Sequence, residues 1–494
     1  MFLELFTVSF VFSLNYDAML YAFNLNILKN YFPIFFLRFS VGLLLSLNIS
    51  LFNAQNTFLE DNSYDALFVK WNNTLDENNH ALALSCPKID TVRIAVIGLG
   101  NRGQSALGRL PNIPGVKIVA IADIDTNKVN NLHEKHFKNY QYKKPVKYYG
   151  KEDWKVICQR NDIDLIYVCT HWELHSPIAI YAMKNDKHVA VEVPAAMTVK
   201  DCWKLVKTAE KTRKHCIQLE NCMYDFFEIT VLNMSQNNLF GDLVHAEGAY
   251  IHDLRALNFS NTYYWNHWRL KNLQKTNGNT YPTHGLGPLA HLLDIHRGDK
   301  MTHLVSMSSN QYGLTKYSEE NFAPENKWNG ISFEKGDMNT TLIRTQKGKT
   351  IMLQHDVTSP RPYSRLFTLS GTNGFVQKYP VKSMAFEPNA HQSISVEDIN
   401  DTLSKYEPTV IKQIKDTAKQ IGGHGGMDYI MDYRLIYCLR NGLPLDQDVY
   451  DAAEWSSIVE LSKKSVNKGS KPMKIPDFTK GNWKLLDKVN YYLK

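Results

Sequence analysis

The stretch Val92–Gly103, VRIAVIGLGNRG, decides how this chain folds. An apolar, largely β-branched run ends at Gly98, and Gly98, Gly100 and Gly103 then form the pattern G-x-G-x-x-G. A run of this kind predicts a buried strand. Glycines placed between a strand and a helix let the backbone approach a pyrophosphate at the helix N-terminus. The stretch therefore predicts the first turn of a dinucleotide-binding domain.

The acidic residue that completes this pattern is Asp123, directly after a second apolar run, Lys117–Ala122. A carboxylate at this place can bind both ribose hydroxyls and disfavours a 2'-phosphate. We therefore expect NAD as the cofactor, in preference to NADP. The alternative is that the glycines serve only a tight turn and packing.

Strand-like and helical segments alternate from Val92 to Asn221. Three further strands are predicted at Asp164–Cys169, His188–Val193 and Cys216–Leu219, with helices at Ser176–Lys184 and Thr198–Arg213. Strands separated by helical crossovers indicate a parallel, doubly wound sheet.

Beyond Asn221 the strand-like segments follow one another with few helices between them. They are Leu243–Tyr250, His303–Ser308, Asn339–Arg344, Thr350–Gln354 and Arg365–Leu369, before helices at Met427–Arg440 and Tyr450–Ser465. This pattern is typical of an antiparallel sheet with one uncovered face. The predicted fold class is thus α/β: an N-terminal doubly wound Rossmann sheet followed by an α+β domain with an open, mostly antiparallel sheet. The uncovered face favours a homo-oligomer.

The bulk composition sets the domain number and excludes several classes. A chain of 494 residues with 44% hydrophobic content should form about two domains. We expect a connector at residues 55–90, the Rossmann domain at 91–221 and a substrate domain at 222–494. The 56 basic and 49 acidic residues are interspersed, which gives no sign of nucleic-acid binding. The seven cysteines lack a C-x-x-C pair, so neither a zinc ribbon nor a disulfide framework is indicated.

The N-terminal residues 1–54 resemble an export signal. An apolar run at Tyr31–Phe52 follows Lys29 and precedes Asn-Ala-Gln, which resembles a small-residue cleavage site near Ala54. We expect a signal peptide and a location in the periplasm or cell envelope, with Met19 as an alternative start. A retained membrane anchor is the other interpretation, because the run is long enough to span a bilayer although Arg38 interrupts it.

Three motifs place the chain near a known group of enzymes. The segments CTHWELHSPIAIYAM (169–183), VEVPAA (191–196) and QLENCMYD (218–225) resemble the glucose–fructose oxidoreductase and inositol dehydrogenase superfamily. That superfamily usually carries Glu-Lys-Pro, whose lysine helps to remove the proton of the substrate hydroxyl, where this chain has Glu192-Val193-Pro194. The positions of its Asp-x-x-x-His pair fall on Gly287 and His291. The dehydrogenase apparatus is therefore incomplete here.

A second set of motifs resembles a particular family. The segments YPTHGLGPLAHLLDIHRGD (281–299), HWRL (267–270), SPRPYSR (359–365) and GGHGGMDY (422–429) resemble glycoside hydrolase family 109, the NAD-dependent α-N-acetylgalactosaminidases. The resemblance covers nearly all of 92–465. It implies hydrolysis of terminal α-N-acetylgalactosamine with retention, through oxidation at C3, elimination, addition of water and reduction, an exception to the usual two-carboxylate route. A sugar dehydrogenase and a non-catalytic NAD-holding sugar-binding protein are the alternatives.

The glycine-rich motif and the resemblance together imply three sets of site residues. Those implied around NAD are Gly98, Gly100, Asn101, Arg102, Gly103, Asp123, Trp172, Glu173, Leu174, His175, Glu192, Val193 and Asn221. Those implied at the sugar are Tyr250, Arg269, Tyr281, Pro282, Thr283, His284 and Tyr363. The acid and base functions are implied among Glu192, Tyr224, Tyr281, His284 and Tyr363.

Physical chemistry limits these roles in several ways. His284 titrates near neutrality and can move a proton, or it could merely cap a helix that begins near Gly287. Tyr281 and Tyr363 could act as acids if a nearby cation lowered their pKa, and Arg361 and Arg365 flank Tyr363.

Other residues of these motifs have alternative interpretations. Arg269 follows the aromatic cluster 263–268, which could pack against a sugar face or form a cation–π core contact with the arginine. His424 lies in a glycine loop that could close over a ligand. An unpaired buried carboxylate is costly, so Glu192 should have a partner. His284, His291 and His296 are spaced by seven and five residues, which puts no pair at i and i+4, so we expect no metal there.

Overall fold

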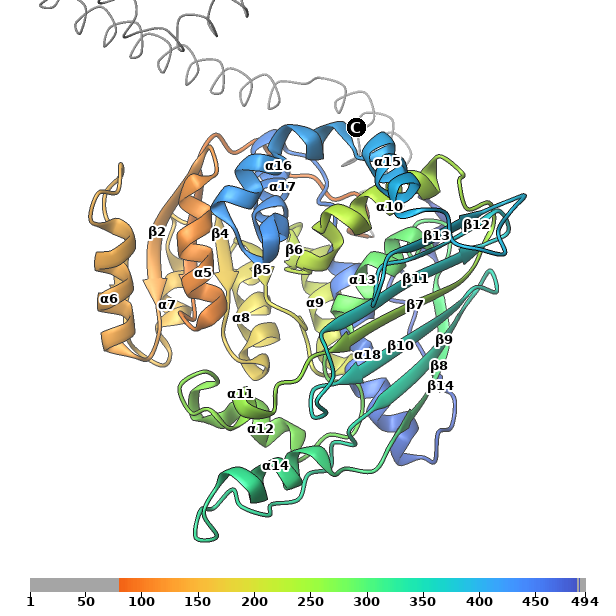
Figure 1. Cartoon of the computed structure of the whole chain (residues 1–494). Coiled ribbons are helices and arrows are strands. Elements are labelled where there is room, and N and C mark those ends of the chain that lie inside the picture. The colour runs from red at the N-terminus through yellow and green to blue at the C-terminus, as the bar shows by residue number, and fades with distance from the viewer. Residues whose placement is uncertain (1–79, 487, 489–494) are drawn as a thin grey trace, which may run out of the picture. The chain divides into compact units, whose positions relative to one another are not determined.

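The computed structural model describes residues 80–486 and residue 488 (Figure 1). Its first sheet is formed by β1 (Val92–Ile97), β2 (Val116–Ala122), β3 (Val146–Tyr148), β4 (Leu165–Val168), β5 (His188–Val191) and β6 (Cys216–Gln218). The order is β3-β2-β1-β4-β5-β6 and every pairing is parallel. This confirms the predicted doubly wound sheet, whose chain order reverses beside β1 and so opens a ligand crevice there.

The helices of this half are α5 (Asn101–Arg109), α6 (Thr126–Phe137), α7 (Asp153–Gln159), α8 (Trp172–Lys184) and α9 (Val199–Thr212). Helix α8 begins four residues before the predicted start at Ser176, because Pro177 lies inside the helix and not in its first turn. The motif residues Trp172–His175 therefore form the first helical turn after β4. The short edge strand β3 was not predicted, since it is only partly buried.

The second sheet is built from β7 (Leu243–Ile251), β8 (Met301–Ser308), β9 (Asn339–Thr345), β10 (Thr350–Asp356), β11 (Ser364–Gly371), β12 (Gly374–Gln377), β13 (Ser383–Phe386) and β14 (Met473–Lys474). Its order is β13-β12-β11-β7-β10-β9-β8-β14, with β7 and β10 parallel and the other pairings antiparallel. The predicted open, mostly antiparallel sheet is confirmed.

Helices α13 (Thr283–Leu292) and α18 (Val449–Asn467) cover one face of this sheet (Figure 1). Buried and exposed residues alternate along β9, where Leu342 and Arg344 are exposed between buried neighbours. Such alternation is typical of a sheet with one packed and one uncovered face. The packed face carries α13, and with it Thr283 and His284 of the YPTH motif.

The C-terminal helices connect the two sheets. Asp432 on α17 (Met427–Asn441) lies 2.9 Å from Arg109 of α5 and accepts a hydrogen bond of 2.8 Å from the Tyr167 hydroxyl of β4. Helix α18 packs against α9 and β6 as well as β8. The sequence predicted both helices but not their contacts with the first sheet. Because α18 packs against strands of both sheets, it joins the second sheet to the NAD-binding sheet.

The predicted signal peptide at 1–54 and residues 55–79 of the predicted connector lie outside the described residues. Residues 80–90 are not a free linker, because Ala81, Leu82 and Leu84 are buried in the core beneath the first sheet. Within the described part of the chain, no helix combines the length and apolar character that crossing a bilayer requires.

Candidate active site

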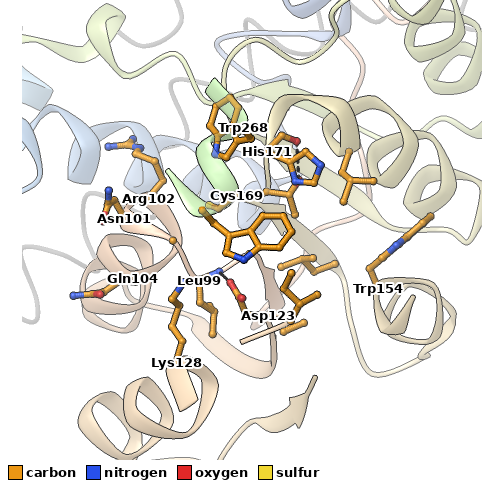
Figure 2. A pocket seen from close by; sticks show the side chains of 18 of the residues that line it. Leu99, Asn101, Arg102, Gln104, Asp123, Lys128, Trp154, Cys169, His171 and Trp268 are labelled. Atoms are coloured by element: carbon orange, nitrogen blue, oxygen red, sulfur yellow. Dashed lines mark hydrogen bonds between the residues drawn. The ribbon is translucent and has the colours of Figure 1, made fainter. Parts of the chain in front are cut away.

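The glycine-rich loop after β1 borders a cavity of about 690 Å³ (Figure 2). Gly98 has φ +90°, and a Cβ there would lie 2.6 Å from the Cys169 carbonyl oxygen. A Cβ at Gly103 would lie 1.9 Å from the carbonyl oxygen of Gly98, so Gly103 serves close packing. A Cβ at Gly100, by contrast, would have no other atom of the described residues within 4 Å, apart from its chain neighbours. The open space around Gly100, at the N-terminus of α5, fits a pyrophosphate held by backbone N–H groups.

Asp123 lines this cavity beside the glycine-rich loop and is already oriented. Its Oδ2 accepts a hydrogen bond of 2.6 Å from the Leu99 amide, and its Oδ1 accepts one of 3.0 Å from the Asp125 amide. The carboxylate thereby fixes the loop that would hold the phosphates. Its remaining acceptor capacity fits the two hydroxyls of a ribose.

The predicted cofactor residues divide into two groups. Gly98, Gly100, Asn101, Arg102, Asp123 and Leu174 line the cavity. The others near it are supporting residues: Trp172 packs edge-on against Trp268 with ring centres 4.8 Å apart, and Glu173 is exposed. The ring nitrogens of His175 lie 2.8 Å and 3.0 Å from the carbonyl oxygens of Pro194 and Thr170, so His175 ties two strand-end loops together.

Glu192, at the end of β5, has the partner that its burial required. Arg102 Nε donates to Glu192 Oε1 at 2.6 Å, and the same guanidinium lies 2.9 Å from Asp428 Oδ2 at the start of α17. Asp428 also accepts a hydrogen bond from the Asn221 amide. Burial would raise the pKa of Asp428, but Arg102, His424 and Arg109 outweigh burial and hold that pKa far below its usual range.

Two neighbours complete this network. Val193 is buried beside Glu192, and His424 of the glycine loop lies 3.0 Å from Asp428 and 3.3 Å from Arg102. The glycine loop at 422–426 is therefore attached to the dinucleotide loop.

Four predicted sugar residues gather in a second cluster, which we call the tyrosine–histidine cluster: Tyr250, Tyr281, His284 and Tyr363. The ring centres of Tyr281 and His284 lie 4.9 Å apart and those of Tyr250 and Tyr281 lie 4.6 Å apart. Tyr363 faces Tyr250 at 6.4 Å. These side chains come from β7, from the start of α13 and from the residue before β11.

The expected helix start near Gly287 was wrong. Helix α13 begins at Thr283, after the N-cap Pro282, so His284 is a residue of the first helical turn and not a cap in front of it. Thr283 is fully buried. His284 is thus held by a helix whose apolar remainder is packed against β7, which keeps its imidazole in a fixed place in the cluster.

The condition set for Tyr281 and Tyr363 as acids, a pKa lowered by a nearby cation, is not met. Burial raises the pKa of Tyr281 and of Tyr363, although both residues are partly exposed, and it raises the pKa of Tyr250 as well. Arg365 lies 3.4 Å from the Tyr363 hydroxyl but also binds Asp225 and Glu228, and Arg361 lies 3.9 Å from Asp356. The phenols therefore stay protonated near neutral pH and can donate.

Arg269 forms a cation–π core contact, the alternative to a sugar-stacking cluster. Its guanidinium lies 4.9 to 6.0 Å from the ring centres of Trp172, Tyr250, Tyr264 and Tyr281, and it is 5% exposed. Tyr263, Tyr264, Trp265 and Trp268 line the cofactor cavity. Arg269 therefore supports the cluster by packing against the rings of Tyr250 and Tyr281.

Tyr224 is buried away from solvent, where its hydroxyl could not reach a substrate as an acid or base. Its side chain is 1% exposed, and its hydroxyl donates at 3.2 Å to Asp446, which is already paired with Arg434 at 2.9 Å. The structure places Tyr224 in the core beneath α17. His291 is likewise a packing residue, 3.6 Å from Asp451 and against the ring of Trp455.

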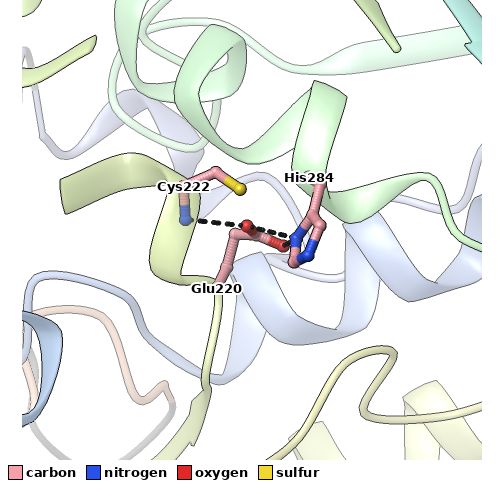
Figure 3. A group of neighbouring side chains, drawn as sticks. All are labelled: Glu220, Cys222 and His284. Atoms are coloured by element: carbon pink, nitrogen blue, oxygen red, sulfur yellow. Dashed lines mark hydrogen bonds and ion pairs between the residues drawn. The ribbon is translucent and has the colours of Figure 1, made fainter. Parts of the chain in front are cut away.

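Sequence reasoning missed two residues that contact the tyrosine–histidine cluster. Glu220 is fully buried and accepts hydrogen bonds of 2.7 and 2.9 Å from His284 Nδ1 (Figure 3). His252 Nδ1 lies 3.1 Å from the Tyr250 hydroxyl, and its ring packs edge-on against Tyr363. Glu220 lies two residues after β6, near the strand end, and this position was the signal that could have identified it.

Comparison with known proteins places this geometry in a family. Residues 224–485 match the family described as "Glycosyl hydrolase 109, C-terminal domain", and residues 92–219 match "Oxidoreductase family, NAD-binding Rossmann fold". An alpha-N-acetylgalactosaminidase of Bacteroides fragilis is 51% identical over 408 residues, which cover 82% of this chain and 96% of that protein. The chain belongs to glycosyl hydrolase family 109. A family 109 protein of Porphyromonas gingivalis is 49% identical, over 84% of this chain and 89% of the relative.

Solved structures with the same fold are more distant from this family 109 enzyme. An NAD-binding oxidoreductase from Klebsiella pneumoniae has a TM-score of 0.60 at 15% identity, and it is covered completely by 78% of this chain. A levoglucosan dehydrogenase in complex with NADH and L-sorbose has a TM-score of 0.58 at 16% identity, with the same coverage. At such identities the likeness shows the fold alone. NAD is the cofactor of the family 109 enzyme, and the cavity beside Gly100 and Asp123 fits it.

Proposed function

We propose that this enzyme hydrolyses glycosides that end in α-linked N-acetylgalactosamine, with retention of configuration. The observation that carries the proposal is the tyrosine–histidine cluster beside the second sheet. It is combined with an NAD-binding sheet in which Val193 follows Glu192. A net dehydrogenase of this superfamily would carry a lysine at Val193. The relative named alpha-N-acetylgalactosaminidase, at 51% identity, supports the sugar.

The cofactor would be held by residues that the site already orients. Backbone amides beside Gly100 would receive the pyrophosphate, and Asp123 the ribose. Bound there, NAD would supply a reversible hydride transfer with C3 of the sugar, which would make the C2 proton acidic and would leave no net redox change. The Arg102–Glu192 pair keeps the glycine-rich loop and the end of β5 together at this site.

The protein's own groups must move the protons of this route. One proton leaves the C3 hydroxyl, one leaves C2, and one is delivered to the oxygen of the leaving group. His284 is the member of the cluster whose imidazole ring can both accept and donate a proton, and its side chain is 14% exposed. Tyr281 and Tyr363 keep their protons because their pKa values are raised, so they suit hydrogen-bond donation to sugar oxygens or to the leaving group.

The substrate is tested with a panel of chromogenic glycosides and purified holoenzyme. We expect 4-nitrophenol release from the α-N-acetylgalactosaminide, and at least tenfold lower kcat/KM for the α-galactoside, because a site built for a polar group rejects the analogue that lacks it. Equal rates on both substrates would contradict the N-acetyl specificity. No release from any α-glycoside of the panel would contradict the hydrolase itself.

We also propose that the enzyme is exported and self-associates. The apolar run at 31–52 followed by Asn-Ala-Gln supports export, and the exposed Leu342 on the uncovered side of β9 supports association through the open sheet. N-terminal sequencing of the mature protein from the cell envelope tests the first. The second is tested by measuring the sedimentation coefficient of the wild type and of Leu342→Glu, where we expect an oligomer and a smaller species respectively. Monomers in both proteins would contradict self-association.

A further inference from the structure

The contact between Glu220 and His284 goes beyond the residues that the motifs indicate. We propose that Glu220 is the positioning residue of a Glu–His dyad, in which it holds the Nδ1 proton of His284 and leaves Nε2 as the nitrogen that exchanges protons with the sugar. This rests on the proposed function. Glu220 Oε1 and Oε2 lie 2.7 and 2.9 Å from Nδ1 (Figure 3). The two side chains come from different parts of the fold, the end of β6 and the first turn of α13.

The hydrogen on this contact can be assigned from the chemistry of the partners. Burial alone would raise the pKa of Glu220, but the charge and hydrogen bond of His284 outweigh it and lower that pKa, so the carboxylate is ionised near neutral pH. An ionised carboxylate only accepts hydrogen bonds. It accepts a second one, of 3.1 Å, from the Cys222 amide. The Nδ1 of His284 must therefore carry a hydrogen in both the charged and the neutral ring, and Nε2 is the atom that gains and loses a proton.

The surroundings of the imidazole fix its plane. The ring of Tyr281 meets it at 87° with centres 4.9 Å apart, and the ring of Tyr250 meets it at 71° and 5.4 Å. The His284 side chain is 14% exposed and the Glu220 side chain is 0% exposed. A buried acid behind a histidine that reaches solvent is the arrangement in which the acid orients the ring and the ring meets the substrate.

Gly287 makes room for this carboxylate. A Cβ at Gly287 would lie 2.7 Å from Glu220 Cγ and 3.2 Å from the ring of Trp455. Gly287 is the position on which the aspartate of the related dehydrogenases falls, and His291, on which their histidine falls, is turned to Asp451 and Trp455. The acid in this chain is thus supplied by the end of β6, and the histidine by the helical turn before Gly287.

The Sγ of Cys222 and the nitrogen and oxygen atoms of this pair lie within 4.8 Å of one another. The separation of 2.7 Å between Nδ1 and Oε1 is nevertheless that of a direct, charge-assisted hydrogen bond. The dyad needs no ion to explain its geometry.

The chain offers a matched pair for control. Glu454 Oε2 lies 2.8 Å from His296 Nε2, and both residues are buried between α18 and the segment after α13. Neutralising Glu454 makes the same chemical change to a buried Glu–His pair outside the tyrosine–histidine cluster. The Glu454 variant therefore shows what the loss of a buried ion pair does to stability and activity when the dyad is intact.

The test compares Glu220→Gln, Glu220→Asp, Gly287→Ala and Glu454→Gln in the holoenzyme, by kcat and KM on the chromogenic α-N-acetylgalactosaminide, NAD affinity and thermal unfolding. We expect Glu220→Gln to lower kcat by about 10²- to 10⁴-fold, the range of acid–base catalysis, with KM changed about threefold or less. Glu220→Asp should recover part of kcat. Gly287→Ala should lower kcat with both members of the dyad present, and Glu454→Gln should lower only the melting temperature.

The outcomes separate the dyad from the proposed function. A wild type that releases no product would defeat the proposed function. An active wild type with kcat for Glu220→Gln within about threefold of it, or an equal loss in Glu454→Gln, would overturn the dyad alone. If Glu220→Gln does not fold, Glu220→Asp decides, since a kcat equal to that of the wild type would overturn the positioning role and a reduced kcat at unchanged KM would support it.

Discussion

Arg102 Nε lies 2.6 Å from Glu192 Oε1, so the helix after the glycine-rich loop is joined to the end of β5 by an ion pair across the cofactor site. The same guanidinium reaches Asp428 on α17, which also contacts Asn221. One arginine therefore holds together both halves of the NAD-binding sheet and helix α17.

Arg102→Met should weaken NAD binding by about tenfold or more and lower the melting temperature by several degrees, because the buried Glu192 and Asp428 lose their shared cation. Titration with NAD and thermal unfolding of the apoprotein measure the two effects. Arg102→Lys should retain part of both. If the melting temperature and the Kd for NAD are unchanged in Arg102→Met, the ion pair is not what fixes this site.

Gly100→Ala should leave folding unchanged and weaken NAD binding, since its methyl group would enter the open space that we assign to the pyrophosphate. The matched control is Gly108→Ala in the same helix, where a Cβ meets only the His136 ring at 3.7 Å. We expect a Kd raised about tenfold or more in the first variant and a wild-type Kd in the second. Equal affinities for NAD would show that the phosphates bind elsewhere.

Tyr363→Phe and Tyr224→Phe should have opposite effects. Removing the hydroxyl of Tyr363 should lower kcat by about 10²-fold or more at a nearly unchanged melting temperature, because its ring packs beside Tyr250 in the cluster and its hydroxyl, which accepts a long hydrogen bond of 3.4 Å from Arg365, can still donate to the sugar. Removing that of Tyr224 should lower the melting temperature, because Asp446 loses a buried donor, with kcat near that of the wild type. A severe loss of kcat in Tyr224→Phe would restore Tyr224 to the catalytic set.

The stability of the protein should fall as the pH rises from about 6.5 to 10. Burial opposes a charge on His296, but Glu454 and Asp451 outweigh burial and raise its pKa to about 10, whereas an unfolded histidine titrates near 6.5. Between these values the folded state holds a proton that the unfolded state lacks, so the free energy of unfolding decreases with pH. Urea unfolding should give a shallower decrease in Glu454→Gln. Parallel pH profiles would contradict the assignment.

Much of this fold could be predicted from local patterns. The run before Gly98, the glycines and Asp123 follow one another in a fixed order and have one common structural solution, and the first sheet was predicted strand by strand except for β3. The strand-like segments that follow one another with few helices between them likewise predicted the second sheet, and the alternating burial along Asn339–Thr345 agrees with it. These features depend on periodicity, which a single sequence carries.

The contacts that complete the site are long-range and have no local signal. The pairing of Glu220 with His284 spans 64 residues and that of Arg102 with Asp428 spans 326, so neither could be derived from spacing. Tyr224 shows the converse: its motif suggested the site, while the packing beneath α17 turned its hydroxyl to Asp446. The effect of burial on the tyrosine pKa values also required the fold, because the neighbouring arginines were visible in the sequence and the desolvation was not.

The central claim, a hydrolysis that passes through a temporary oxidation of the sugar, is tested most directly by turnover in deuterated water. The purified holoenzyme is given the chromogenic α-N-acetylgalactosaminide, while nitrophenol release, NADH absorbance and deuterium at C2 of the released sugar are followed together. We predict product with deuterium at C2 and no net NADH. Product released without deuterium at C2, or NADH formed in proportion to the sugar consumed, would contradict the account.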